Sequence, residues 1–193
     1  MKLIDSYGRM HRDLRVSLTD RCSLRCTYCM PFNFDKWLPN ETLLTAPEIV
    51  KVIEIAVSQG IKEVRLTGGE PLLRPDIVEI VSRINSLETV PELSMTTNGV
   101  ALAKFANDLA KAGLKRINIS LDTLDWERFK RLTFRDRYDD VIEGIAAALE
   151  QFPIINSSLD GDKIIYKKDI NIGMATALPT GNLIVPVIKG ANQ

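Results

Sequence analysis

The sequence predicts an α/β fold of about four βα units, followed by a shorter β-rich C-terminal segment. Two observations support this prediction. Short apolar runs alternate with amphipathic stretches up to residue 149, and the alternation stops near residues 151–153. Strands that alternate with helices pair in parallel through right-handed crossovers. The predicted domains are residues 1–147, which hold the βα units, and residues 148–193, which hold the β-rich segment.

Each predicted element has a local signal. The first helix begins at Thr45, where Glu48 completes a capping box, and it ends at Gly60. Four short apolar runs predict the parallel strands: 14–18, 63–67, 92–96 and 116–120. Amphipathic spacing predicts the remaining helices: 75–87, 101–112, 125–132 and 139–149. In the tail, Asp160-Gly161-Asp162 between two β-rich runs predicts a hairpin.

Composition restricts the classes of function. The chain has 45% hydrophobic and 26% charged residues and no formal net charge, which is typical of a globular protein without a bulk field for nucleic acid or anionic membrane. No apolar run approaches a membrane span, and no signal peptide is visible. Three clustered cysteines cannot form a paired disulfide framework, so we expect a reducing, cytoplasmic location.

The cysteines carry the strongest chemical signal. Cys22, Cys26 and Cys29 are the only cysteines of the chain and lie within eight residues. Three thiolates can hold three irons of a 4Fe-4S cluster and leave the fourth iron open for chemistry. The alternative is a zinc site, for which His11 is the only available histidine ligand.

Other motifs follow the predicted strands directly. Gly68-Gly69-Glu70 follows the second strand, Thr96-Thr97-Asn98-Gly99 the third and Ser120-Leu121-Asp122 the fourth. Ligands of α/β folds bind at this carboxyl edge of the sheet. The glycines would let a ligand approach the backbone closely, and Glu70 would place a negative charge near it. Ordinary turns and helix caps are the alternative explanation of each motif alone.

Three arginines lie in or beside the same strands and loops. Arg15, Arg65 and Arg74 carry guanidinium groups that suit phosphate recognition. The alternative for any single arginine is a solvated surface charge.

The motif Cys22-x-x-x-Cys26-x-x-Cys29 and its context from Arg15 to Pro31 resemble the radical S-adenosylmethionine (SAM) GTP 3′,8-cyclases of molybdenum cofactor biosynthesis, over about residues 3–145. The resemblance implies a partial (βα) radical SAM barrel, a metal-binding and GTP-binding lyase, and an electron donor as partner. It assigns the cluster to the three cysteines and no catalytic residue beyond them. The implied SAM contacts are Tyr28, Gly68, Gly69, Glu70 and Ser120. The implied GTP contacts are Arg15, Arg65 and Thr96.

The resemblance also implies a reaction and a limit. In the family the cluster gives one electron to SAM, and the resulting 5′-deoxyadenosyl radical takes hydrogen from the ribose of GTP. The family's later half carries a second three-cysteine cluster, and no cysteine follows Cys29. We therefore expect this chain to be truncated and unable to complete the cyclisation.

The tail suggests a second interpretation. Residues 146–193 resemble a fragment of the dihydrolipoamide acyltransferase catalytic domain of 2-oxo acid dehydrogenase complexes, without its catalytic histidine motif. Exposed strands in such a fragment would favour self-association. The alternative function is thus a non-catalytic fusion or chimera whose tail mediates assembly. A zinc-bound regulatory domain is the third.

Overall fold

The computed structural model describes residues 3–31, 33–151, 157–160 and 163–166, and the pairs 172–173, 176–177, 183–184 and 187–188. It consists of two compact units. The first comprises residues 1–23, 33–98 and 108–120, and the second comprises residues 24–32, 99–107 and 121–193. The predicted domain boundary after residue 147 stays a prediction.

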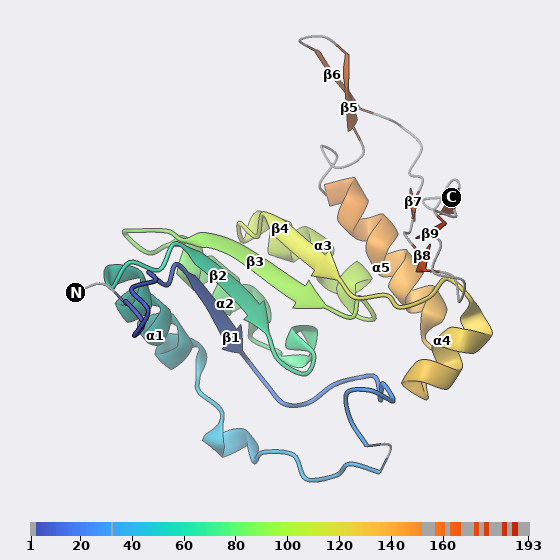
Figure 1. The fold of residues 1–193 in the computed structure, drawn as a ribbon, viewed down its shortest axis with the longest axis horizontal. Helices are drawn as coiled ribbons and strands as arrows, with labels where there is room; N and C mark the ends of the chain where they lie inside the picture. The colour runs from blue at the N-terminus through green and yellow to red at the C-terminus, as the bar shows by residue number, and fades with distance from the viewer. Residues whose placement is uncertain are drawn as a thin grey trace. The chain divides into compact units, whose positions relative to one another are not determined.

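A four-stranded parallel sheet forms the centre of the first unit (Figure 1). The strands are adjacent in sequence order, so each crossover leads to the neighbouring strand. Their bounds are β1 Asp13–Ser17, β2 Glu63–Thr67, β3 Glu92–Thr97 and β4 Arg116–Ile119. The structure confirms the predicted βα order and places each strand within one residue of its predicted bounds.

The helices also match the prediction, with shifted ends. Their bounds are α1 Ala46–Ser58, α2 Ile77–Asn85, α3 Leu102–Lys111, α4 Trp126–Thr133 and α5 Tyr138–Gln151, with 3-10 turns η1 Asn40–Thr42 and η2 Pro71–Leu73. The capping box is present: a carboxylate oxygen of Glu48 accepts from the backbone N–H of Thr45 at 2.8 Å and from its hydroxyl at 2.7 Å. The first bond gives the backbone N–H of Thr45, the N-cap residue of α1, its acceptor.

The two faces of the sheet differ in chemistry. Val64, Leu66 and Met95 are completely buried on the face that meets α1 and α2, whose buried residues include Ile53 and Ile80. The core of this unit is therefore the layer between the sheet and these helices. The opposite face carries polar side chains that lie in register across the strands: Arg15 beside Arg65, Arg65 beside Ser94 and Ser94 beside Arg116.

In the tail, β5 (Ser157–Asp160) pairs antiparallel with β6 (Lys163–Tyr166), and Asp160 lies opposite Lys163. This pairing agrees with the predicted hairpin. Two further short antiparallel pairs are β7 Ile172–Gly173 with β10 Val187–Ile188, and β8 Thr176–Ala177 with β9 Leu183–Ile184. Much of the predicted tail lies outside the described residues. Among the described residues, no helix combines the length and apolar character needed to cross a membrane.

Candidate functional site

The chain that leads into Cys22 is joined closely to the loop after β2. The N–H of Gly69 donates to the carbonyl of Thr19, and the N–H of Glu70 donates to the carbonyl of Arg21, both at 2.7 Å. A Cβ on Gly68 would lie 2.5 Å from the carbonyl oxygen of Thr19. These glycines thus allow another main-chain segment of the protein to approach, so the segment before Cys22 and the loop after β2 pack directly against each other.

The same loop keeps acceptors for a ligand. No hydrogen bond to the carbonyl oxygens of Gly68 and Gly69 is present among the described residues. An amino group is a donor and needs such acceptors. The loop therefore offers main-chain oxygens, whereas its N–H groups at Gly69 and Glu70 are already used within the protein.

Glu70 is a buried structural carboxylate. It is 1% exposed, and burial raises its pKa, although hydrogen bonds from Asn98, Thr97 and Leu72 act in the opposite direction. One oxygen accepts from the Thr97 hydroxyl at 2.6 Å and from the Leu72 N–H at 3.0 Å. The other accepts from the Asn98 N–H at 2.8 Å. Glu70 thus ties the loop after β2 to the end of β3.

Asn98 extends this network to a cysteine. Its side-chain nitrogen donates to the Ser23 hydroxyl at 3.0 Å and lies 3.7 Å from the sulfur of Cys22, within hydrogen-bonding reach of sulfur. Ser120, another residue of this edge, donates its N–H to the carbonyl of Thr97 at 2.9 Å. The edge of the sheet therefore brings together Cys22, the glycine loop, Asn98 and Ser120, as their positions after the strands predicted.

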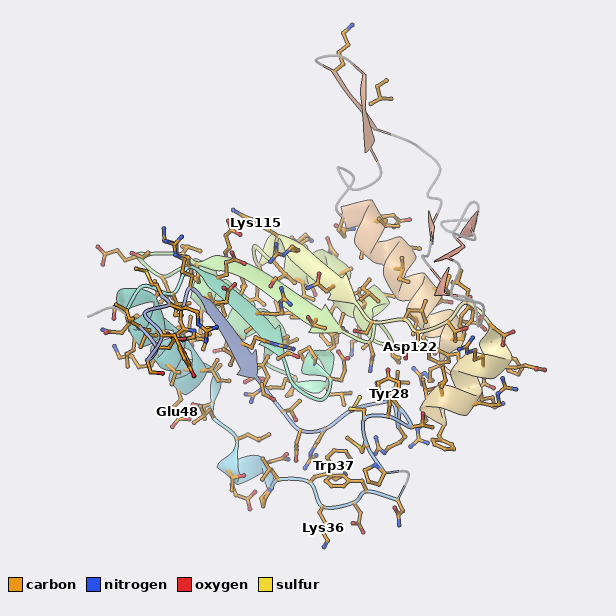
Figure 2. All side chains as sticks on the ribbon, viewed as in Figure 1. Tyr28, Lys36, Trp37, Glu48, Lys115 and Asp122 are labelled. Atoms are coloured by element: carbon orange, nitrogen blue, oxygen red, sulfur yellow. The ribbon has the colours of Figure 1, made fainter. Side chains whose placement is uncertain are left out.

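The second unit holds the other two cysteines. The N–H groups of Arg25 and Thr27 donate to carbonyls at the end of α4, both at 2.9 Å, and the N–H of Cys29 donates to the carbonyl of Cys26. The Tyr28 hydroxyl donates to a carboxylate oxygen of Asp122 at 2.6 Å (Figure 2). Desolvation of the hydroxyl and this bond raise the pKa of Tyr28, although 68% of the residue is exposed.

Three thiolates are a donor set that suits a 4Fe-4S cluster with one open iron. None of the three cysteines forms a disulfide with a described residue. Within the described part of the chain, no three His, Cys, Asp or Glu side chains gather around one point as a single metal ion requires. In a 4Fe-4S cluster each thiolate binds a different iron, so the thiolates need not converge on one ion. His11, the fourth ligand of the zinc alternative, is exposed and lies 3.9 Å from a carboxylate oxygen of Asp5.

A second group of predicted site residues lies on the polar face of the sheet. Arg15 on β1 is the register partner of Arg65 on β2, and both line a cavity of about 130 Å³ together with Ser94. Neither guanidinium has a hydrogen bond or ion pair with any described residue. Thr96 lies on this face as well, two residues beyond Ser94 on β3. The residues assigned to GTP thus share one face of the sheet.

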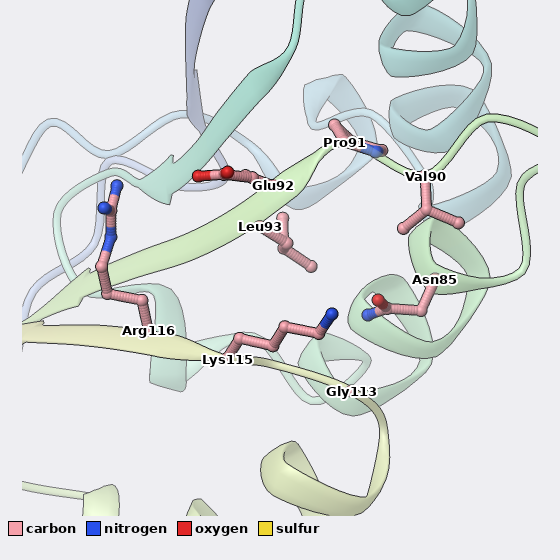
Figure 3. A pocket seen from close by; sticks show the side chains of 8 residues that line it. All are labelled: Asn85, Val90, Pro91, Glu92, Leu93, Gly113, Lys115 and Arg116. Atoms are coloured by element: carbon pink, nitrogen blue, oxygen red, sulfur yellow. The ribbon is translucent and has the colours of Figure 1, made fainter. Parts of the chain in front are cut away.

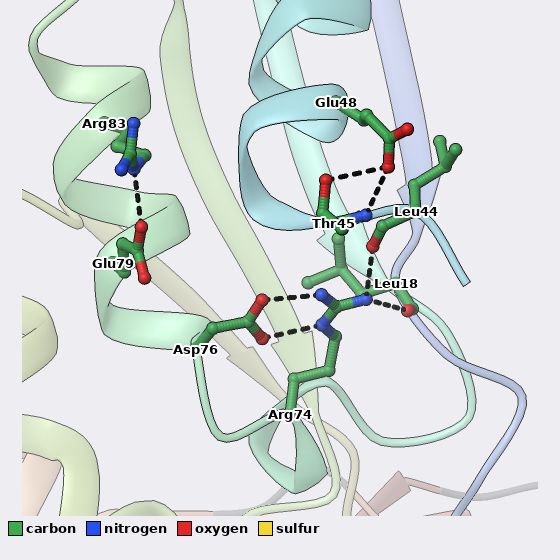
Figure 4. A network of polar contacts seen from close by, with 8 residues as sticks. All are labelled: Leu18, Leu44, Thr45, Glu48, Arg74, Asp76, Glu79 and Arg83. Atoms are coloured by element: carbon green, nitrogen blue, oxygen red, sulfur yellow. Dashed lines mark hydrogen bonds and ion pairs between the residues drawn. The ribbon is translucent and has the colours of Figure 1, made fainter. Parts of the chain in front are cut away.

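Arg74 does not belong to this group. Its guanidinium makes a two-pronged contact with Asp76, at 2.8 and 2.6 Å, and also donates to the carbonyls of Leu18 and Leu44 (Figure 4). The interpretation of Arg74 as a phosphate ligand is therefore wrong, because its donors hold the end of β1 and the chain before α1. The hydrogen bond between the two groups raises the pKa of Arg74 and lowers that of Asp76.

A larger cleft, of about 300 Å³, lies at the amino ends of β3 and β4. Lys115 and Asn85 point into it near the start of β3 and β4 (Figure 3). The side-chain nitrogen of Asn85 donates hydrogen bonds to the carbonyls of Val81 and Ala112. The cleft lies at the amino ends of the strands and contains none of the predicted site residues.

Sequence reasoning missed roles for Asn98 and Asp20. Asn98 was part of a motif noted only for its place after a strand, and this place was the available signal. One carboxylate oxygen of Asp20 accepts from the N–H of Leu38 at 2.6 Å, while the other is buried without a partner among the described residues. A single aspartate before a cysteine motif gives no sequence signal for this contact.

Comparisons with known proteins agree with this arrangement. The profile of the Radical SAM superfamily matches residues 16–161. A GTP 3′,8-cyclase of Streptomyces coelicolor is 61% identical over 149 residues, which cover 77% of this chain and 44% of that protein. A GTP 3′,8-cyclase of Mycobacterium sp. (strain KMS) is 51% identical over 164 residues, covering 83% and 47%. The chain thus spans under half the length of these relatives.

Solved structures give the same fold. Streptococcus suis SuiB bound to SAM aligns with a TM-score of 0.58 and 25% identity, covering 73% of this chain and 30% of SuiB. SuiB bound to the precursor peptide SuiA aligns with a TM-score of 0.61 and 24% identity, covering 72% and 30%.

The comparisons do not support the expected acyltransferase resemblance of residues 146–193. They do support the partial βα fold and the cofactors of the cysteine motif, since the matched family uses a 4Fe-4S cluster and SAM. Because the superfamily profile matches most of the sequence, and the segment before Cys22 packs against the glycine loop of a parallel sheet, the chain belongs to the radical SAM superfamily.

Proposed function

We propose that this chain is the cluster- and SAM-binding part of a GTP 3′,8-cyclase of molybdenum cofactor biosynthesis. The observation that carries the proposal is the close joining of the chain before Cys22 to Gly68, Gly69 and Glu70. This contact fixes a cluster ligand beside main-chain carbonyls that can accept from the amino group of SAM. The 51–61% identity to GTP 3′,8-cyclases supports the reaction class.

The residues have distinct roles in this proposal. Cys22, Cys26 and Cys29 hold the cluster, which when bound supplies the electron that cleaves SAM to a carbon radical. Gly68 and Gly69 offer carbonyls to the amino group of SAM, and Ser120 lies at the same edge. In the second unit, the hydrogen bond between Tyr28 and Asp122 orients the loop that carries Cys26 and Cys29. Glu70 supports the loop and does not contact SAM, because both oxygens of its carboxylate accept hydrogen bonds from the protein.

GTP is the proposed substrate, bound through Arg15, Arg65 and Thr96. Two charged guanidinium groups lie in register, and neither forms an ion pair with a described residue, although Asp13 and Glu63 line the same cavity. A triphosphate would neutralise this charge and could use both guanidinium forks. The position of this pair on the polar face, away from the core, leaves it accessible to a ligand.

The test is anaerobic reconstitution with iron and sulfide, followed by a SAM-cleavage assay under strong reductant. We expect iron and sulfide uptake, and 5′-deoxyadenosine as product, in the wild type. Cys22→Ala, Cys26→Ala and Cys29→Ala should each abolish both. His11→Ala is the matched control, since it removes the proposed zinc ligand and should leave iron uptake unchanged. Zinc uptake without iron, sensitive to His11→Ala, would support the zinc domain instead.

The proposal has two further parts. We expect 5′-deoxyadenosine without cyclised GTP, because the chain has no cysteines for a second cluster; detection of cyclised product would overturn this part. An electron donor is the expected protein partner, and the cytoplasm is the proposed compartment. Self-association of the chain is a further expectation that size can test. A large defined oligomer in size-exclusion chromatography would favour it, and a monomer would exclude it.

A further inference from the structure

We propose that Asn98 is a positioning residue of the cluster, which tunes its reduction potential by donating a hydrogen bond to the sulfur of Cys22, and that Glu70 holds Asn98 in place for this role. This inference rests on the cluster proposed above. It assigns a function to the asparagine of the loop after β3.

The geometry provides the donor. The side-chain nitrogen of Asn98 lies 3.7 Å from the sulfur of Cys22 and 3.0 Å from the hydroxyl oxygen of Ser23. An amide nitrogen carries two hydrogens, enough for both acceptors. A metal-bound cysteine is a thiolate and can only accept, so the nitrogen of the amide, not its oxygen, must face it.

The geometry also restrains the donor. The Asn98 N–H donates to one oxygen of Glu70 at 2.8 Å, and the hydroxyl of the preceding Thr97 donates to the other at 2.6 Å. Glu70 is 1% exposed and its own N–H is bound to the carbonyl of Arg21, one residue before Cys22. The main chains on both sides of the contact between Asn98 and Cys22 are therefore fixed by the same residue.

The chemical consequence has a definite sign. Hydrogen bonds to the sulfur ligands are among the factors that set cluster potentials. Donation withdraws negative charge from the sulfur, which favours the reduced, more negative state of the cluster. The Asn98 contact therefore raises the potential, and its loss lowers it. Loss of an outer contact to a metal ligand typically changes metal affinity or activity by about tenfold or more, and we expect an effect of similar size on reduction. A tenfold change in the equilibrium constant of one-electron reduction corresponds to about 59 mV.

The experiment is a redox titration of the reconstituted protein, followed by electron paramagnetic resonance, with variants sorted by donor content. Asn98→Leu and Asn98→Asp remove the donor, whereas Asn98→Ser and Asn98→Gln retain one. Asn107→Asp, at an exposed position of α3, controls for the added charge. We expect Asn98→Leu and Asn98→Asp to lower the potential by an amount equal to a tenfold change or more. Asn98→Ser and Asn98→Gln should lie closer to the wild type, and Asn107→Asp should match it.

The outcomes separate the hypotheses. Equal potentials in all fully loaded variants, or an order that follows side-chain size, would overturn the inference. If cluster uptake is lost, loss in the Leu and Asp variants alone supports the donor role, and loss in all four variants overturns it. Failure of the wild type to take up iron would instead contradict the proposed function.

The role of Glu70 has its own test. Glu70→Gln puts an NH₂ group where the N–H of Asn98 or the hydroxyl of Thr97 now finds an acceptor. Because Glu70→Gln also removes a negative charge, which by itself raises the potential, the test is the effect of Asn98→Leu in both backgrounds. We expect Asn98→Leu to lower the potential less in Glu70→Gln than in the wild type. Fully additive shifts would show that Glu70 does not act through Asn98.

Discussion

Arg65 and Glu70 lie close together along β2 and the loop that follows it, and the fold treats their charges in opposite ways. Glu70 is buried and accepts three hydrogen bonds from the protein. Arg65 has no such contact with any described residue, and its register neighbour Arg15 carries the same charge. A charge whose partners belong to the protein stabilises the structure, whereas a repelling pair left open is available to a ligand.

This contrast separates two kinds of site residue. One kind forms the loop edge, which contacts within the protein hold in place: Gly68, Gly69, Glu70, Thr97 and Asn98. Substitutions in the loop edge should reduce the stability of the fold. The other kind is the arginine pair, Arg15 and Arg65. Substitutions in the arginine pair should weaken ligand binding and leave the fold intact. Stability and binding measurements on matched variants can break or sharpen this distinction.

Glu70→Ala should have the largest effect on stability. It leaves three donors without their acceptor at a buried site, and each buried unsatisfied group costs about 1–3 kcal/mol. We expect a loss of about 3 kcal/mol or more in the free energy of unfolding, measured by urea denaturation. Glu79→Ala is the control, because Glu79 is half exposed and, among the described residues, forms an ion pair only with Arg83. A loss from Glu70→Ala no greater than that of Glu79→Ala would contradict the structural role.

Gly69→Ala tests the close contact of the loop edge. The new Cβ would collide with the carbonyl oxygen of Asp20, 2.5 Å away, and with main-chain atoms of Arg21. Overpacking of this kind costs about 1–3 kcal/mol, and we expect about 2 kcal/mol together with reduced iron uptake. Gly8→Ala is the matched control, because its φ of 78° is unfavourable for alanine while its Cβ meets nothing within 4 Å. If Gly8→Ala impaired iron uptake as strongly, steric contact at Gly69 would not explain the effect.

Asp76 gives a prediction about pH. The hydrogen bond from Arg74 holds the pKa of Asp76 below its usual value of 3.8. A depressed carboxyl pKa stabilises the fold above the unfolded-state value, and this stabilisation is lost as the pH falls through the folded-state value. We expect Asp76→Asn to cost about 1.5 kcal/mol near pH 6. The difference from wild type should shrink below pH 3.8, and a difference independent of pH would contradict the ionic origin.

The sequence was sufficient for the order of strands and helices, because the apolar spacing and the capping box of Thr45 and Glu48 are local signals. It also grouped the motifs, since they follow strands that end at one edge of the sheet. It could not assign the roles of single polar residues. Arg74 and Arg65 look alike in sequence, and only the fold brings Asp76, Leu18 and Leu44 to one and leaves the other without a partner. The contact between Asn98 and Cys22 likewise joins segments 76 residues apart.

Arg65→Met should have the smallest effect on stability, and in the opposite direction. Like charges that face each other across neighbouring strands destabilise a sheet by up to about 1 kcal/mol, and methionine keeps much of the apolar stem. We therefore expect the free energy of unfolding to stay constant or rise by about 0.2–1 kcal/mol, while GTP binding, measured by calorimetry, weakens. Arg83→Met, on the exposed side of α2, should leave GTP binding unchanged. If Arg65→Met lost stability as Glu70→Ala does, then the arginine pair would be structural too, and its open charge would no longer point to a ligand.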